Sequence, residues 1–256
     1  MNDTIEKKLD AIAFYQRHPE YKPFIGERFD KFRVLQVGES HYVNIGQTPE
    51  TENDFSLQYF ADNWWNSHCD KLFNQPDGDP ETKCWGSWYT TRDVIGRFLI
   101  HNQKNYSIFM NMIRVLNEVV KELPKCDNER QTYHYFAFMN FFQMPALYKG
   151  VSFEKSLSKA EKGMADPTAV YKRTVEESCK VLNDVINILQ PNVIVFTSKA
   201  AYYAYCNREG EMAEKDGRII KAVHPCCSWW NRKHGEDQKT GKERLVEQLR
   251  SVYGSK

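Results

Sequence analysis

Apolar residues along the chain gather into short continuous runs that predict β-strands. In the first run, Val34, Leu35 and Val37 lack the polar alternation of a half-exposed strand, so burial on both faces is expected, as in a parallel sheet. The four runs are FRVLQVG (32–38), TYHYFAFMNFF (132–142), NVIVF (192–196) and RIIKAV (218–223).

Between these runs, apolar residues recur at helical spacing. Predicted helices cover 3–17, 54–65, 91–101, 106–123, 168–189, 198–206 and 242–252. Pro167 favours the start of the longest helix and Pro191 favours its end. Because strands alternate with helices, we predict an α/β protein with three αβα layers around a mostly parallel four-stranded central sheet.

No internal repeat or low-complexity linker divides the chain. A length of 256 residues with 41% apolar residues is sufficient for one large core. We therefore predict a single domain over residues 1–256, with an N-terminal helical extension and an elaborated region at about 44–130.

Charge and cysteine usage restrict the possible partners. The 35 Lys and Arg residues nearly balance the 34 Asp and Glu residues, so any binding of nucleic acid depends on a local basic patch. The seven cysteines form no C-x2-C pair, so we expect reduced thiols, no metal site and no cofactor. No apolar stretch approaches the roughly 20 residues of a membrane span, and no secretory signal opens the chain. We expect a cytoplasmic monomer without membrane contact.

Polar residues follow three of the four predicted strands directly. Glu39 comes after the first strand, Asn140 lies near the end of the second, and His224 follows the fourth. Ligands of open α/β sheets bind in the crevice beyond the carboxyl ends of the strands. If these strands are parallel neighbours, then a carboxylate, an amide and an imidazole meet at one pocket.

The order of these motifs resembles the uracil-DNA glycosylase superfamily. Its members carry V-G-E-x-P-G or G-Q-D-P-Y after the first strand, an Asn at the end of a middle strand, and a late H-P-S loop. VLQVGESHY, FAFMNFFQMP and IIKAVHPCCSWWNR look like these three motifs, and VIVFTSKAAYYAY looks like a further strand and helix of the family. The chain departs from the pattern where Ser40-His41 replaces the proline turn, Ser198 replaces a glycine and Cys226 replaces the serine.

The resemblance implies that the protein cleaves an N-glycosidic bond in DNA. Glu39 then stabilises the positive sugar or positions water, while His224 donates to the negative leaving base. Asn140 pairs with the edge of a flipped pyrimidine through one donor and one acceptor. An aromatic floor for the base is expected from Tyr42 and Phe55. His41 lies beside them, as a further pocket residue or a second acid–base group that titrates near pH 6.5.

The late loop also carries residues suited to DNA. An aromatic pair followed by cations fits the family's strand-probing loop. The residues expected to contact DNA are Trp229, Trp230, Arg232 and Lys233.

Two other functions remain open from the sequence. The altered motifs are compatible with a catalytically inactive member of the same fold that binds nucleic acid or a nucleobase. The balanced charge is compatible with an unrelated α/β hydrolase of a small molecule that uses Glu39 and His224 as acid and base. In that enzyme Cys226 or Cys227 is a candidate nucleophile.

Overall fold

The computed structural model describes residues 3–42, 61–62, 64–65, 91–100, 107–120, 129–148, 150–159 and 166–253. Its centre is a five-stranded sheet in the order β1-β3-β2-β4-β5. The strands are β1 (Phe24–Ile25), β2 (Val34–Gly38), β3 (Phe136–Asn140), β4 (Val193–Phe196) and β5 (Ile219–Lys221).

The sheet confirms the α/β class and corrects the predicted strand number. Strands β2, β3, β4 and β5 pair in parallel, as expected. The additional strand, β1, pairs antiparallel with β3, so the sheet is mixed and five-stranded instead of four-stranded. Two residues give no periodic pattern, which explains why the sequence did not predict β1.

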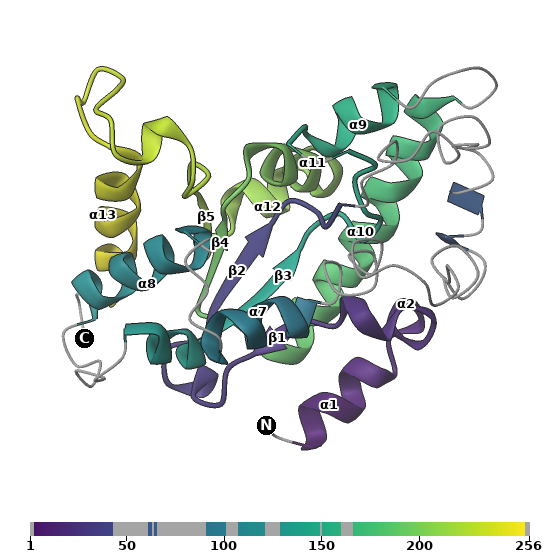
Figure 1. Cartoon of the computed structure of the whole chain (residues 1–256), viewed down its shortest axis with the longest axis horizontal. Helices are drawn as coiled ribbons and strands as arrows, with labels where there is room; N and C mark the ends of the chain where they lie inside the picture. The colour runs from purple at the N-terminus through teal and green to yellow at the C-terminus, as the bar shows by residue number, and fades with distance from the viewer. Residues whose placement is uncertain are drawn as a thin grey trace.

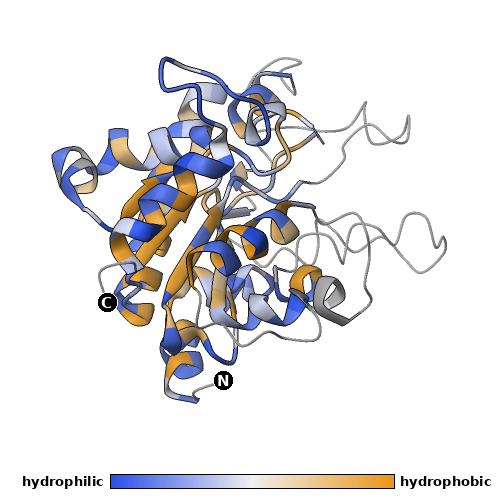
Figure 2. Ribbon diagram, turned by 90° about the vertical axis from the view of Figure 1, so that its left-hand side faces the viewer, coloured by the Kyte–Doolittle hydropathy of each residue, from blue (hydrophilic) through white to orange (hydrophobic). Residues whose placement is uncertain are grey.

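Alternate residues of each central strand enter two separate apolar cores. Leu35 and Val37 of β2 belong to one core, whereas Val34 packs in the other. All residues of β2, β3 and β4 are buried, because helices cover both faces of the sheet. Figure 2 shows the result as apolar strands at the centre of the molecule.

The first core lies under the helices that carry Leu9, Phe14, Phe153, Leu182, Ala201 and Ala213. These helices are α1 (Asp3–Asp10), α2 (Ala13–Arg17), α9 (Phe153–Lys159), α10 (Pro167–Leu189), α11 (Lys199–Glu209) and α12 (Glu211–Lys215). The second core lies under α7 (Thr91–Ile100), α8 (Ser107–Val119) and α13 (Gly241–Tyr253). Figure 1 shows α8 and α13 on one side of the strands, and α10 and α11 on the other.

The ends of α10 follow from its flanking residues. The side chain of Asp166 accepts a hydrogen bond from the Thr168 N–H at 2.9 Å, and Pro167 occupies the first turn. The helix stops at Gln190, which adopts a left-handed conformation with φ of 47° before Pro191. The predicted helix over 168–189 is therefore confirmed to within one residue.

Other boundaries differ from the prediction. The helix expected over 3–17 is two helices, since a turn separates α1 from α2. The strand expected from 132 begins at Phe136, because residues Glu129–Tyr135 form a 3-10 helix. Helices α9 and α12 were not predicted. Of the helix expected over 54–65, only Ala61, Asp62, Trp64 and Trp65 lie within the described residues, and all four are helical.

Helices α7 and α8, which are described parts of the region 44–130, contribute to the body of the protein. Ile95 of α7, together with Phe109 and Met112 of α8, is buried in the second core. The short 3-10 segments Pro19–Tyr21, Phe29–Lys31 and Ser228–Trp230 complete the described secondary structure. None of the described helices combines the length and the apolar character needed to cross a membrane.

Candidate functional site

The carboxyl ends of the four parallel strands place polar side chains along one edge of the sheet. Asn140 ends β3, Glu39 follows β2, Ser198 follows β4 by two residues, and His224 follows β5 by three. The strand order gives the sequence Asn140, Glu39, Ser198, His224 across this edge. The acid, the amide and the imidazole are thus on the same side of the sheet.

Glu39 is the most connected residue of this edge. Its carboxylate accepts a hydrogen bond from the Phe153 N–H at Oε1 and another from the Ser198 hydroxyl at Oε2, both at 2.8 Å. The Ser198 oxygen itself accepts from the Ala201 N–H at the start of α11. Glu39 therefore joins the end of β2 to the starts of α9 and α11, and its charge has a fixed position.

The position of Asn140 depends on a glycine in the neighbouring strand. Asn140 pairs with Gly38 in the parallel ladder, and a Cβ atom on Gly38 would lie only 2.3 Å from Asn140 Oδ1. Asn140 is 8% exposed, and no hydrogen bond engages its amide within the described part of the chain. The amide is therefore held beside Gly38 by packing, with its hydrogen-bonding capacity unused among the described residues.

A tight turn presents the imidazole of His224. The Cys227 N–H donates to the His224 carbonyl at 2.9 Å, and the Cys226 N–H donates to His224 Nδ1 at 3.1 Å. Asn111 of α8 donates to the Pro225 carbonyl at 2.7 Å and fixes the turn to the second core. Because Nδ1 accepts, the ring proton of neutral His224 lies on Nε2, where it can be donated to a ligand.

The electrostatic environment of His224 also favours the neutral ring. Although His224 is exposed, surrounding protein displaces water from the imidazole and lowers its pKa below the ordinary 6.5. The negative charge of Glu39 acts in the opposite direction and raises this pKa. The two groups are therefore near enough to influence each other, as members of one site do.

An aromatic cluster beside Glu39 was not predicted from the sequence. Phe142 and Phe153 stack with ring centroids 4.3 Å apart, and Tyr171 of α10 packs against both. Burial raises the pKa of Tyr171, and the charges of Glu154 and Glu39 raise it further. The half-buried phenol thus remains protonated beside the carboxylate and is a candidate contact for a ligand.

The other residues expected around the base have different positions. His41 is only 6% exposed, its Nε2 lies 2.9 Å from the Thr91 hydroxyl, and Tyr21 packs edge-on against it at 5.1 Å. His41 therefore joins the end of β2 to α7 inside the protein. Tyr42 is half-buried and pairs with Ala146 in an isolated bridge. Phe55 lies outside the described residues.

The two tryptophans of the late loop have opposite environments. Trp229 is 51% exposed, and its ring packs against His234 at 5.0 Å. Trp230 is 1% exposed and belongs to the second core, which corrects the expectation that both residues face DNA. Arg232 and Lys233 are exposed, as surface contacts require.

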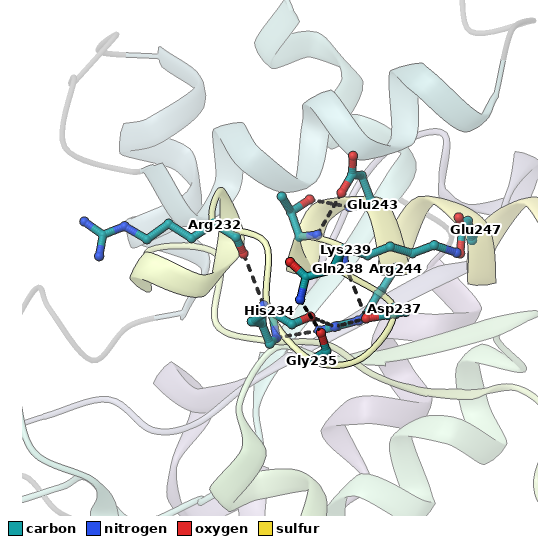
Figure 3. A network of polar contacts seen from close by, with 10 residues as sticks. Arg232, His234, Gly235, Asp237, Gln238, Lys239, Glu243, Arg244 and Glu247 are labelled. Carbon is teal, nitrogen blue, oxygen red and sulfur yellow. Dashed lines mark hydrogen bonds and ion pairs between the residues drawn. The ribbon is translucent and has the colours of Figure 1, made fainter.

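A network of polar contacts orders the segment after Trp229 (Figure 3). Arg244 of α13 donates from Nε to Asp237 at 2.9 Å and also contacts the carbonyl and the ring of His234. His234 and Lys239 form an isolated antiparallel bridge. The Arg244 guanidinium, which hydrogen-bonds Asp237, lowers the pKa of that carboxyl to about 2. Residues 231–240, called the Arg244 loop below, are therefore held in one conformation beside Trp229.

Among the described residues, no group of three or more His, Cys, Asp or Glu side chains is arranged to hold a metal ion. Cys226 is exposed and its Sγ lies 2.9 Å from the Ser107 hydroxyl, while its backbone, not its thiol, contacts His224 Nδ1. The sequence matches no model of a known protein family and no curated protein.

Proposed function

We propose that the protein is a uracil-DNA glycosylase-like enzyme that hydrolyses the N-glycosidic bond of uracil or a related damaged base in DNA. The observation that carries the proposal is that Asn140, Glu39 and His224 lie along one edge of the sheet, where the charge of Glu39 raises the pKa of His224. The proposal includes a glycosylase-like arrangement of the parallel strands and a monomer that acts alone on DNA.

Each group suits one part of this reaction. Cleavage builds positive charge on the sugar and negative charge on the departing base. The fixed carboxylate of Glu39 stabilises the sugar, and the Nε2–H of neutral His224 donates to the base oxygen. The amide of Asn140, which makes no hydrogen bond within the described residues, reads the pyrimidine edge with one donor and one acceptor. Water then bonds to the sugar carbon and its released proton goes to the departing base, so the sugar–base bond is replaced by a sugar hydroxyl and a base N–H.

A second candidate function is favoured by the hydrogen bonds of Glu39. Both carboxylate oxygens already accept bonds from the protein, from Phe153 and Ser198. A carboxylate that is bonded in this way is suited to a purely structural role, in which it joins β2, α9 and α11. In that case the protein binds a nucleobase or nucleic acid at the same edge without cleaving it.

Excision of uracil from a single-stranded oligonucleotide tests the proposal. Glu39→Gln keeps a side chain of the same shape but removes the charge, and His224→Ala removes the donor. We expect each change to lower the single-turnover rate by about 10²–10³-fold, the usual effect of removing a preorganised electrostatic group. The control is Glu118→Gln, which removes the carboxylate of a surface ion pair between Glu118 of α8 and Lys242 of α13.

The outcomes separate the two candidates. Wild-type protein that binds the uracil oligonucleotide without cleaving it supports the binding function and rejects the enzyme. Wild-type protein that neither binds nor cleaves rejects both. Activity that disappears on thiol alkylation instead indicates a cysteine nucleophile, as in the small-molecule hydrolase.

The pH dependence of excision provides a further readout. Protonation of His224 puts a proton on Nδ1, where the Cys226 N–H now points, and breaks that contact. The pKa of His224 is lower in the folded protein than in the unfolded chain. The contact and its contribution to stability are therefore present above pH 6.5, and they are lost as the pH falls through the pKa of His224 in the folded protein. We expect an acid limb of the rate below pH 6.5 that is absent in His224→Gln, whose amide donates without titrating.

A further inference from the structure

Two tyrosines and two lysines form a surface cluster next to the candidate site. Lys199, Tyr202 and Tyr203 come from the first turns of α11, and Lys221 is the last residue of β5. We call these four residues the α11–β5 patch. Neither lysine forms an ion pair with a carboxylate in the part of the chain that the structure describes.

The patch has a defined geometry. Lys221 Nζ donates to the Tyr203 hydroxyl at 3.1 Å and lies 4.9 Å from the Tyr203 ring centroid and 5.2 Å from that of Tyr202. Tyr202 packs edge-on against Phe196 of β4 at 5.9 Å, which anchors the cluster to the core. Tyr203 is 47% exposed, an unusual position for a large aromatic side chain. The patch is thus a fixed aromatic surface with positive charge on it.

The patch adjoins the site on the side of His224. Lys199 directly follows Ser198, which hydrogen-bonds Glu39, and Lys221 precedes His224 by three residues. Hydrogen bonding from Lys221, together with the nearby charges of Lys221 and Lys199, lowers the pKa of Tyr203. The two positive charges therefore converge on the same phenol.

We propose that the α11–β5 patch binds an unpaired segment of a nucleic acid strand that flanks the base held at Asn140. The inference rests on the proposed function for the nature of the ligand and extends it to single-stranded substrate. A base stacks on Tyr203, and the adjoining phosphates contact Lys221 and Lys199.

The chemistry of the patch favours this ligand over two others. A duplex hides the faces of its bases, so it offers phosphates to the lysines but nothing to the exposed ring of Tyr203. An acidic peptide provides charge without repeated flat groups. A single strand provides both at every nucleotide, and aromatic surfaces with cations are the usual way of binding it.

Fluorescence anisotropy with two uracil-containing probes tests the inference. One probe is a single-stranded oligonucleotide that extends well beyond the site, and the other is a uracil nucleotide with one phosphate on each side. For the long probe, Tyr203→Leu should weaken binding about 5- to 150-fold with little change in salt dependence. Lys221→Met should lower the salt slope by roughly one unit. Tyr203→Phe should bind like the wild type, because it keeps the ring.

The control is Arg208→Met, which removes a cation from the same helix where it pairs with Glu176. It should leave binding unchanged, and none of the variants should affect the short probe. Thermal unfolding of Tyr203→Leu checks that the fold is intact.

The results distinguish this inference from the proposed function. One outcome is that the protein excises uracil but Tyr203→Leu and Lys221→Met bind the long probe as well as the wild type does. That outcome overturns the role of the patch and keeps the proposed function. Protein that binds the long probe through the patch without excising uracil keeps the patch and rejects the enzyme. Protein that binds no oligonucleotide, or that prefers duplex or an acidic peptide at these residues, overturns the inference.

Discussion

Gly38 controls the position of Asn140 at the scale of a single residue. In Gly38→Ala the new Cβ would lie 2.3 Å from Asn140 Oδ1 and 3.2 Å from the ring of Phe138. The amide must rotate away, at a cost of about 1–3 kcal/mol for overpacking. We expect a folded protein that has lost recognition of uracil, as measured by binding of a uracil oligonucleotide. Gly96→Ala, where nothing lies within 4 Å, is the control and should bind normally.

The residues of the site differ in how far the sequence predicts them. Glu39, Asn140 and His224 are predicted because each is a polar residue just beyond, or near the end of, an apolar run. Ser198 had been noted only as a replaced glycine, although it bonds Glu39. Tyr171 lies within a long amphipathic helix, where nothing in the local pattern distinguishes it from other aromatic residues. Its proximity to Glu39 arises only when α10 packs beside α9.

At the scale of an element, the Arg244 loop is held by local polar contacts and not by burial in an apolar core. Arg244→Met removes the bonds to Asp237 and His234 while leaving α13 in place. Exposed ion pairs contribute only about 0–1 kcal/mol, so global stability should change little. We expect faster amide hydrogen exchange within residues 231–240 and weaker DNA binding. Arg250→Met, which changes another cation of α13 and removes its pair with Glu118 of α8, should change neither.

Acid should have the same effect on this loop in the wild type. The pKa of Asp237 is about 2 instead of 3.8, so the contact with Arg244 is complete above pH 3.8 and is lost as the pH falls toward 2. Exchange protection of the loop should follow that range in the wild type. Protection that is already absent at neutral pH would contradict an ordered loop.

Elements with strong local signals were predicted best. The helix over 168–189 has a capping Asp166 and a proline at each end, and the structure reproduces it. Residues 132–135, which include Tyr133 and Tyr135, favoured a strand by composition, but they form a 3-10 helix whose Tyr133 stacks on Phe136. Composition alone could not separate these two outcomes, because the tertiary contact decides between them.

The whole molecule has one sheet between two apolar cores. Continuous apolar runs predicted that the central strands are buried on both faces, and the division of alternate residues between the cores confirms it. The sequence could not show which helices cover which face. That assignment depends on contacts between distant segments, such as Trp230 with the core of α8 and α13.

Trp229 and Trp230 are adjacent in the sequence, but Trp229 lies on the surface of the molecule and Trp230 lies in its core. Trp230→Ala removes an indole that is 1% exposed and should lower the free energy of unfolding by about 3–5 kcal/mol. Trp229→Ala removes one that is 51% exposed and should change it by no more than about 0.5 kcal/mol. Urea unfolding measures both, and DNA binding provides the complementary test, since Trp229 is exposed whereas Trp230 is buried in the second core. Equal destabilisation by the two changes would show that Trp229 also supports the fold, and would remove Trp229 from the residues expected to contact DNA.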